Sequence, residues 1–195
     1  PAILLNRNND KQLRNVLRKS LVLVNSRELY NKYHFPDARL YQVKTSTLST
    51  SDFYSREDTC DGVEIKLLYT GSFSYAKGLL ELMEAFQVIS SEYTNTALHL
   101  VGWEYDVARP VEKHLSKLAF ERGIKDKVHF HGFKTVGPDL NLMYRMADIY
   151  IIPSYHEGFP RTIWEAMANS MPVIASRVGS IPHFLKDQEN VFLIE

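Results

Sequence analysis

Apolar runs alternate with helical stretches from residue 64 to the end of the chain. Between residues 78 and 93, apolar side chains recur at positions 79, 80, 82, 83, 86 and 89, close to the helical period of 3.6 residues. We therefore expect helices at Gly78–Tyr93, Pro110–Arg122, Pro138–Met146, Pro160–Ser170 and Ile181–Lys186. The β-branched runs between them predict strands at Ile65–Thr70, Ala97–Gly102, Lys127–His131, Asp148–Pro153, Pro172–Ser176 and Val191–Ile194.

The apolar runs are typical of strands that are buried on both faces. The runs "LLYT" (67–70) and "IYIIP" (149–153) are nearly continuous in apolar residues instead of alternating, which suits a covered parallel sheet. The order of strands and helices predicts an α/β fold with a doubly wound, mostly parallel, Rossmann-like sheet and right-handed crossovers. Ligands on such sheets bind beyond the carboxyl ends of the strands. A ligand is therefore expected at the loops 71–77, 102–109, 131–137, 153–160 and 176–181.

Residues 1–63 do not follow this repeat. The pattern predicts a helix at Lys11–Lys19, a strand at Leu21–Val24 and a helix at Ser26–Tyr33. Ser26 is the expected N-cap of the last of these. Residues 45–62 are rich in Ser, Thr and Asp and have no period, which is typical of a linker. We expect a remnant of a preceding domain at 1–44, a linker at 45–63 and the main domain at 64–195. The chain begins at Pro1, which favours a piece of a longer protein.

The composition is that of an ordinary globular protein of 195 residues, 45% hydrophobic and 24% charged. Lys plus Arg and Asp plus Glu each number 23, so no global field recruits nucleic acid or an anionic membrane, although a local patch still can. We expect no nucleic-acid partner. The single cysteine, Cys60, excludes a disulfide framework and favours a reducing compartment. No apolar run reaches the roughly 20 residues of a membrane span, and no secretory segment is visible. We expect a cytoplasmic protein, either free or peripheral at the inner membrane face.

Two acids mark the stretch "SYHEGFPRTIWEAMANSMPVIASRVGSIP", residues 154–182. Glu157 precedes a Gly-Phe-Pro turn, whereas Glu165 lies among apolar residues of the expected helix, where an unpaired charge is costly. Pro160 suits the first helical position because it needs no N–H there. The backbone N–H groups of residues 161–163 are then unpaired, and together with the helix dipole they predict an anion site.

The two acids are expected to bind hydroxyl groups beside that anion. Glu157 would repel a phosphate at the helix start, so sugar hydroxyls are its more plausible partners. Glu165 lies roughly 7 Å along the helix, and because side chains tilt toward the helix N-terminus it can reach a ribose diol. Two alternatives stay open: Glu157 as an acid that the dipole favours, and Glu165 as a solvated surface acid.

Two further turns belong to the expected site. In "YTGSFSYAKGLLEL" (69–82), Gly71 follows a strand and Lys77 opens the next helix, where a cation opposes the dipole unless it answers a bound phosphate. The alternative is a solvent-facing lysine. In "SRVGSIP" (176–182), the residues Gly179 and Ser180 either donate backbone N–H groups to a ligand or form a plain turn.

The histidines raise the question of a metal. His129 and His131 share one face of an expected strand, and His156 lies beside Glu157. Strand histidines without a ligating acid are more often packing residues, so we expect no metal site. Trp103, at a strand end, either walls the pocket or packs in the ordinary way. A G-x-S-x-G elbow and a G-x-G-x-x-G loop are both absent from the sequence, which disfavours a serine hydrolase and a dinucleotide oxidoreductase.

These motifs, in this order, resemble one family. Residues 64–195 are similar to the C-terminal, nucleotide-sugar-binding domain of retaining glycosyltransferases of the GT-B architecture, the group 1 or family 4 class. The run 154–182 matches the family's pattern of two acids around an E-G-F-P turn, and "YTGSFSYAKGLLELMEAF" (69–86) matches its glycine-lysine run. The run "DKVHFHGF" (126–133) matches a segment that lines the base pocket in relatives. Residues 20–33 look like the end of the family's N-terminal domain, so the resemblance implies a chain truncated at both ends.

The resemblance implies a role for each matching position. Glu157 contacts the donor sugar, Glu165 binds the ribose, and Lys77 neutralises the departing diphosphate, so Glu157 and Lys77 are the implied catalytic residues. The other implied donor-binding positions are Gly71, Ser72, Gly158, Phe159, Pro160, Arg161, Thr162 and Ile163. The implied base pocket is His131, Gly132 and Phe133. The resemblance implies neither a metal nor another cofactor, and a UDP-, GDP- or ADP-sugar as co-substrate.

The implied activity is transfer of a hexose, with retention, to a hydroxyl of a glycan, lipid or small molecule that the missing N-terminal domain binds. The isolated chain is not expected to turn over. The family's arginine after the first glycine is Ser72 here, so one phosphate cation is lost and Arg161 is an alternative source of charge. Two alternatives keep the fold: a non-catalytic sugar-nucleotide-binding module, which Ser72 favours, and a sugar-nucleotide epimerase or phosphorylase.

Overall fold

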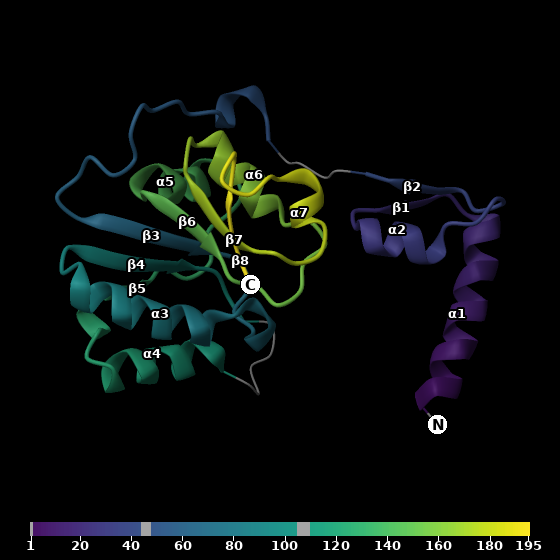
Figure 1. The fold of residues 1–195 in the computed structure, drawn as a ribbon, viewed down its shortest axis with the longest axis horizontal. Helices are drawn as coiled ribbons and strands as arrows, with labels where there is room; N and C mark the ends of the chain where they lie inside the picture. The colour runs from purple at the N-terminus through teal and green to yellow at the C-terminus, as the bar shows by residue number, and fades with distance from the viewer. Residues whose placement is uncertain (1, 44–47, 105–109) are drawn as a thin grey trace. The chain divides into compact units, whose positions relative to one another are not determined.

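The computed structural model describes residues 2–43, 48–104 and 110–195, the first eight of them as backbone alone. The chain forms two compact units, Pro1–Thr45 and Ser46–Glu195, and each contains a parallel sheet of its own. Within the described residues, no helix combines the length and the apolar character that crossing a membrane requires. Figure 1 shows the elements of both units.

The first unit is a small α/β arrangement. Ser26 is the N-cap of its second helix, as predicted, and its hydroxyl accepts a hydrogen bond from the Leu29 N–H at 3.4 Å. The strand near residue 41 was not predicted, because Leu40–Gln42 lacks the continuous apolar run that marks the strand at Val22–Val24. The elements are α1 (Ala2–Lys19), β1 (Val22–Val24), α2 (Arg27–Tyr33) and β2 (Leu40–Gln42), with β1 and β2 parallel.

The second unit is built on a six-stranded parallel sheet with the order β5-β4-β3-β6-β7-β8. This confirms the predicted Rossmann-like α/β fold, and each predicted strand lies within two residues of its observed ends. The strand order reverses between β3 and β6, which is the kind of switch point where ligands bind. The strands are β3 (Ile65–Thr70), β4 (Thr96–Val101), β5 (Val128–Phe130), β6 (Ile149–Ile152), β7 (Val173–Ser176) and β8 (Phe192–Ile194).

Helices cover both faces of this sheet, which explains the continuous apolar strands. On β3, Leu67 and Tyr69 pack against one layer of helices, whereas Leu68 packs against the other. The first layer is α3 (Leu79–Glu92) and α4 (Val111–Glu121), and the second is α5 (Pro138–Met146), α6 (Arg161–Ala168) and α7 (Ile181–Phe184) (Figure 1). Short 3₁₀ helices η1 (Thr50–Asp52), η2 (Tyr75–Lys77) and η3 (Lys125–Lys127) complete the unit.

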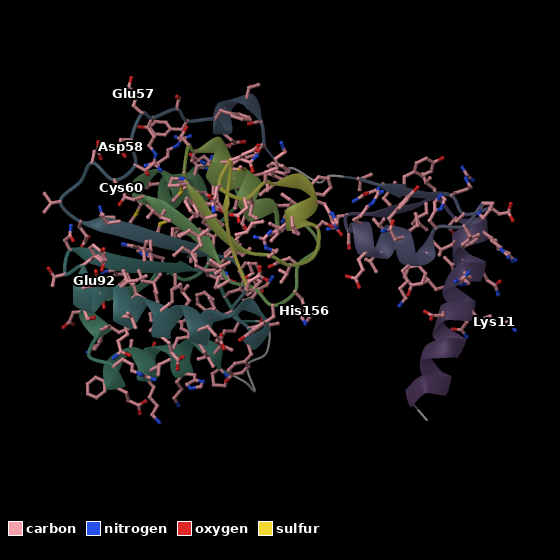
Figure 2. All side chains as sticks on the ribbon, in the orientation of Figure 1. Lys11, Glu57, Asp58, Cys60, Glu92 and His156 are labelled. Carbon is pink, nitrogen blue, oxygen red and sulfur yellow. The ribbon has the colours of Figure 1, made fainter. Side chains whose placement is uncertain are left out.

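The segment expected as a linker packs against the second unit in its described part, residues 48–63. The Arg56 guanidinium donates hydrogen bonds of 2.9 to 3.2 Å to four backbone carbonyls at the ends of α5 and α6, those of Tyr144, Arg145, Ala147 and Asn169. Helix ends leave carbonyls unpaired and carry partial negative charge, so one cation suits both ends. The unit therefore begins at Ser46, not near residue 62 as the polar composition predicts. Cys60, on the same segment, is exposed (Figure 2).

Two glycines bring the loops at the carboxyl edge of the sheet into contact. Gly78 has φ of 64°, and a Cβ there would lie 2.0 Å from the Pro153 carbonyl oxygen. Gly179 has φ of 58°, and a Cβ there would lie 1.7 Å from the Glu157 carbonyl oxygen. Neither position can hold a side chain without displacing backbone. The loop that carries Glu157 is thus pressed between the start of α3 and the turn after β7.

Candidate functional site

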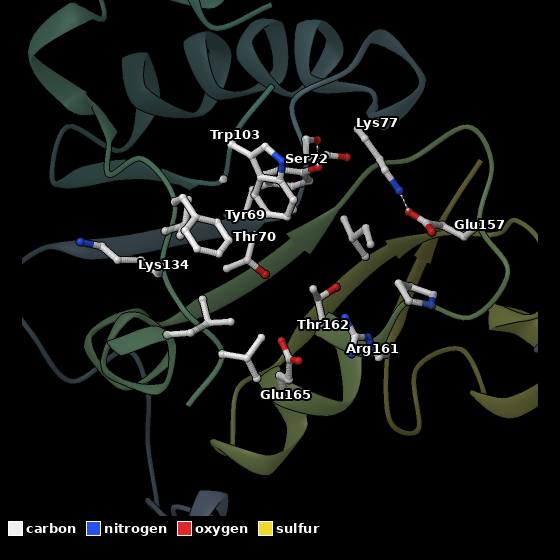
Figure 3. Close-up of a pocket in the computed structure, with 18 residues that line it drawn as sticks. Tyr69, Thr70, Ser72, Lys77, Trp103, Lys134, Glu157, Arg161, Thr162 and Glu165 are labelled. Atoms are coloured by element: carbon white, nitrogen blue, oxygen red, sulfur yellow. Dashed lines mark hydrogen bonds and ion pairs between the residues drawn. The ribbon is translucent and has the colours of Figure 1, made fainter. Parts of the chain in front are cut away.

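A cavity of about 260 Å³ opens at the carboxyl edge of the second unit's sheet, at the loops where a ligand was expected (Figure 3). Residues from the ends of β3, β4 and β6, from the loops after β3, β4, β5 and β6, and from α5 and α6 surround it. The lining residues are Tyr69, Thr70, Gly71, Ser72, Lys77, Val101, Gly102, Trp103, Phe133, Lys134, Val136, Leu140, Ile152, Glu157, Pro160, Arg161, Thr162 and Glu165.

Lys77 and Glu157 form an ion pair at one end of this cavity. The distance from Lys77 Nζ to Glu157 Oε1 is 2.6 Å, and the two side chains are 25% and 9% exposed. Lys77 ends η2, and the left-handed turn at Gly78 then starts α3. The alternative of a solvent-facing lysine is therefore wrong. The two charges compensate each other. An incoming anion can therefore bind the Lys77 ammonium only in competition with the Glu157 carboxylate.

Glu165 lies toward the other end of the cavity and is 5% exposed, so the alternative of a solvated surface acid is wrong. The Tyr144 hydroxyl, on α5, donates a hydrogen bond of 2.9 Å to Glu165 Oε2. Burial raises the pKa of the Tyr144 hydroxyl well above its usual value, so the group remains a proton donor at neutral pH. Sequence reasoning missed Tyr144, because a tyrosine in an apolar helix gives no signal beyond ordinary packing.

The start of α6 lies between the two acids in Figure 3, which places Arg161 and Thr162 there. The helix begins at Arg161, and Pro160 is its N-cap, one position earlier than predicted. The Ile163 N–H already donates to the Pro160 carbonyl at 3.2 Å, and the Ile163 side chain is buried in the core. The predicted anion site therefore reduces to the backbone N–H groups of Arg161 and Thr162, with the exposed Arg161 side chain beside them.

Gly158 and Phe159 shape the loop and do not belong to the cavity lining. The Gly158 carbonyl accepts a hydrogen bond of 2.8 Å from the Ser180 N–H, so that N–H is used inside the protein and the turn at Ser180 supports the loop. The Phe159 ring packs on Trp164 and Phe184, with centroid distances of 4.6 and 5.2 Å.

The turn after β3 forms the wall beside Lys77. Gly71 and Ser72 both line the cavity. The Tyr69 hydroxyl donates to the Ser72 carbonyl at 2.9 Å, which fixes this turn. The position where the resemblance implies an arginine thus has a small hydroxyl side chain at the cavity wall.

Of the three residues of the expected base pocket, one lines the cavity and two do not. Phe133 lines the cavity with Trp103, and their rings meet edge to face at 4.9 Å, so Trp103 does wall the pocket. His131 is not among the lining residues: its ring stacks on His99, where the His99 Nδ1 to His131 Nε2 distance is 2.8 Å. Gly132 also lies outside the lining, and its carbonyl accepts a hydrogen bond from the backbone of the loop after β4. The aromatic rings of Trp103 and Phe133 at the cavity wall suit a flat ring of a ligand.

The histidine cluster is a packing feature of the edge strands. His99, on β4, lies directly opposite His129 on β5, with ring centroids 4.9 Å apart. Burial and the neighbouring His131 and His129 lower the pKa of His99 to about 4, so this ring is neutral at pH 7. No cluster of three His, Cys, Asp or Glu side chains in the described part of the chain is arranged for a metal ion. His156, which neighbours Glu157 in the sequence, is exposed (Figure 2).

Comparison with known proteins points to one family. The family described as "Glycosyl transferases group 1" matches residues 52–195. The O-antigen chain mannosyltransferase B of Escherichia coli is 30% identical over 175 residues, which cover 82% of this chain and 43% of that protein. The chain spans 31% to 43% of the length of three curated relatives that each match more than half of it.

Solved structures share the fold. The C-terminal domain of the group 1 family glycosyl transferase LpcC from Francisella tularensis aligns with a TM-score of 0.66 and 26% identity, over 76% of this chain and 80% of that one. Anabaena Alr3699/HepE, solved in complex with UDP and glucose, aligns with a TM-score of 0.80 and 19% identity, over 96% of this chain and 53% of that one.

Proposed function

Because the chain belongs to the group 1 glycosyl transferases, we propose that it is the donor-binding half of a hexosyltransferase. The longer protein transfers a hexose from a nucleoside-diphosphate sugar to an acceptor hydroxyl, with retention and without a divalent metal. The observation that carries this proposal is the arrangement of the cavity: the Lys77–Glu157 ion pair and the buried Glu165 line one space, with the start of α6 between them.

The diphosphate occupies the middle of the cavity in this proposal. The Lys77 ammonium and the N–H groups of Arg161 and Thr162 are the donors that neutralise it, and the turn at Gly71 allows a close approach. Glu157 accepts hydrogen bonds from the sugar once Lys77 turns to the phosphate. The nucleoside lies toward Glu165, which accepts from the ribose, and its base lies against the aromatic rings at the far end.

The chemical contribution of this half is stabilisation of the leaving group. When the bond between the anomeric carbon and the phosphate oxygen breaks, negative charge grows on that oxygen. Lys77 and the N-terminus of α6 are already in place to stabilise it, without reorganisation at the moment of reaction. The departing phosphate takes the proton of the acceptor hydroxyl, which attacks on the same face of the sugar, so the configuration is retained.

The relatives support this class of donor. HepE was solved with UDP and glucose, and the matching E. coli protein is named a mannosyltransferase. UDP-, GDP- and ADP-sugars are therefore the donors to test. The acceptor, whether a glycan, a lipid or a small molecule, is bound outside this chain in the proposal, and a cytoplasmic location stays a prediction.

Isothermal calorimetry and thermal shift of the 195-residue chain with UDP, GDP and ADP test the proposal. One nucleotide is expected to bind with a Kd in the micromolar to millimolar range and to raise the melting temperature. The Lys77→Met variant should weaken this binding at least about tenfold, because it removes a charge-assisted hydrogen bond. The control Lys113→Met, on the exposed face of α4, removes the same charge and should bind as the unaltered chain does. Absence of heat and of thermal shift with all three nucleotides contradicts the proposal.

A non-catalytic sugar-nucleotide-binding module is the second candidate, and Ser72 at the cavity wall favours it. In that case the longer protein binds the nucleotide but consumes no sugar nucleotide. Product analysis separates the candidates: a new glycosidic bond with retained configuration supports the transferase, whereas an isomerised sugar nucleotide or a sugar phosphate indicates an epimerase or a phosphorylase.

A further inference from the structure

Glu165 is held by a chain of hydroxyl groups from two other elements. The Tyr144 hydroxyl, on α5, donates to Glu165 Oε2 at 2.9 Å and lies 2.7 Å from Thr70 Oγ1 at the end of β3. All three side chains are buried, with Tyr144 at 0%, Thr70 at 3% and Glu165 at 5% exposure. Thr70 and Glu165 line the cavity, whereas Tyr144 lies behind them. Tyr144 therefore reaches the cavity through its two neighbours.

The hydrogen bonds in this series of hydroxyl groups all point toward Glu165. An ionised carboxylate can only accept a hydrogen bond, so Tyr144 gives its one proton to Glu165. The Tyr144 oxygen must then accept at its 2.7 Å contact with Thr70, so Thr70 Oγ1 gives its one proton there in preference to the Tyr150 hydroxyl, which lies farther away at 3.3 Å. Within the described residues, the hydrogen bond to this carboxylate is the one at Oε2, so Oε1 stays open to a ligand in the cavity.

We propose that Tyr144 is a positioning residue, which fixes the Glu165 carboxylate so that it reads the vicinal 2′- and 3′-hydroxyls of a ribose. The inference rests on the proposed function, in which the nucleoside lies against Glu165. A glutamate side chain has several rotatable bonds whose freedom is lost when a ligand orders it. Tyr144 and Thr70 impose that order before the ligand arrives, because both are locked in the core.

The choice of a phenol as donor matters as much as its position. A cation beside Glu165 would neutralise the carboxylate, whereas the Tyr144 hydroxyl leaves its full negative charge in place. Hydrogen bonds from neutral hydroxyls to a charged acceptor are about twice as strong as those to a neutral one. The arrangement therefore favours a ligand that offers hydroxyl donors and no charge at this end, as a ribose does.

The test compares each ribonucleotide with its 2′-deoxy counterpart on the whole 195-residue chain. Calorimetry gives the Kd for UDP, GDP and ADP and for their 2′-deoxy forms, and the ratio of the two constants measures how well the 2′-hydroxyl is read. The variants are Tyr144→Phe and Thr70→Val. The control is Tyr33→Phe, which removes a phenol hydroxyl that donates to a carboxylate of the first unit, Asp10, at 3.2 Å.

For the unaltered chain, the 2′-deoxy form should bind at least about tenfold more weakly, because it loses a hydrogen bond to a charged group. Tyr144→Phe should reduce this ratio to about threefold or less, Thr70→Val should reduce it in the same direction, and Tyr33→Phe should leave it unchanged. A purely structural role would weaken both nucleotides equally and keep the ratio. An unchanged ratio in Tyr144→Phe, or a ratio near one in the unaltered chain, overturns the inference alone. No binding of any ribonucleotide overturns the proposed function and the inference with it.

Discussion

Substitution of Glu157 by glutamine should make the chain bind a nucleoside diphosphate more tightly. Lys77 Nζ lies 2.6 Å from Glu157 Oε1, so the ammonium that we assign to the diphosphate already has a charged partner. An incoming phosphate must share this ammonium and approach the carboxylate. Glutamine keeps the shape and an acceptor oxygen but removes the negative charge, so the repulsion disappears while the lysine stays in place.

The size of the effect follows from the geometry. A phosphate within hydrogen-bond distance of Lys77 lies about 5 Å from the carboxylate, where two unit charges repel by roughly 0.8 kcal/mol in water and about 3 kcal/mol at an effective dielectric constant of 20. The Glu157 side chain is 9% exposed, which places it between these limits. A gain of about 1–2 kcal/mol corresponds to a Kd that is about 5 to 30 times smaller.

The assay is calorimetry with UDP, GDP and ADP on Glu157→Gln, on Lys77→Met and on the double variant. Lys77→Met leaves a mostly buried carboxylate unpaired, so it should also lower stability by about 1–3 kcal/mol, and the double variant should recover most of this loss. The control Glu92→Gln removes the same charge at the exposed far end of α3. The reasoning is refuted if Glu157→Gln keeps its melting temperature but binds the nucleotide no more tightly than Glu92→Gln does.

Three further predictions concern stability and loop geometry. Arg56→Gln should lower the free energy of unfolding of the second unit by about 2–4 kcal/mol in a urea titration, because it leaves helix-end carbonyls unpaired; a loss below about 0.5 kcal/mol contradicts the capping role. His99 has a folded-state pKa near 4, below its unfolded value, so its neutral form stabilises the fold above about pH 6.5 and this stability is lost as the pH falls toward 4. In urea titrations, His99→Gln should flatten the dependence of the unfolding free energy on pH in this range, whereas the exposed control His114→Gln should not. Gly179→Ala should cost more than about 1 kcal/mol, since its Cβ would meet the Glu157 carbonyl. It should also weaken a sugar nucleotide more than the free nucleotide in calorimetry; if Gly179→Ala binds the sugar nucleotide as tightly as the unaltered chain does, the loop contact does not support binding.

The sheet could be predicted because its physical requirement is visible in the sequence. A parallel strand covered on both faces must be apolar throughout, and runs such as "LLYT" show this without knowledge of their neighbours. The segment 48–63 shows the limit of the same reasoning. Its polar composition predicts a linker, but Arg56 holds it against helix ends about 90 residues or more away in the chain. The composition of a segment shows that it lacks apolar residues, but it does not show which distant carbonyls its side chains bind.

The sequence predicts where the site residues lie along the edge of the sheet, but not which side chains they contact. Strand ends converge on one edge of a parallel sheet, so Lys77, Glu157 and Glu165 could be placed near one another from the order of elements. The contacts that define their chemistry depend on side-chain directions: Lys77 pairs with Glu157 across 80 positions, and Tyr144 reaches Glu165 from a different helix. The His131 side chain shows the same limit, because its ring lies against His99 and outside the cavity lining.

The two acids of the cavity have different partners, and the difference fits different tasks. Glu157 is paired with Lys77, whose long side chain is 25% exposed. In the proposed function this pair opens when the phosphate arrives, which releases the carboxylate for sugar hydroxyls and the ammonium for the phosphate. Glu165 is fixed by a buried neutral phenol that cannot move to a ligand, so its charge and its position remain the same before and after binding. In the proposed function, an exchangeable partner suits the end of the cavity where bonds would change, and a fixed partner suits the end where a nucleoside would be bound. With Ser72 in place of the arginine that the resemblance implies, Lys77 is a cation of the cavity lining that the proposed function assigns to the phosphate.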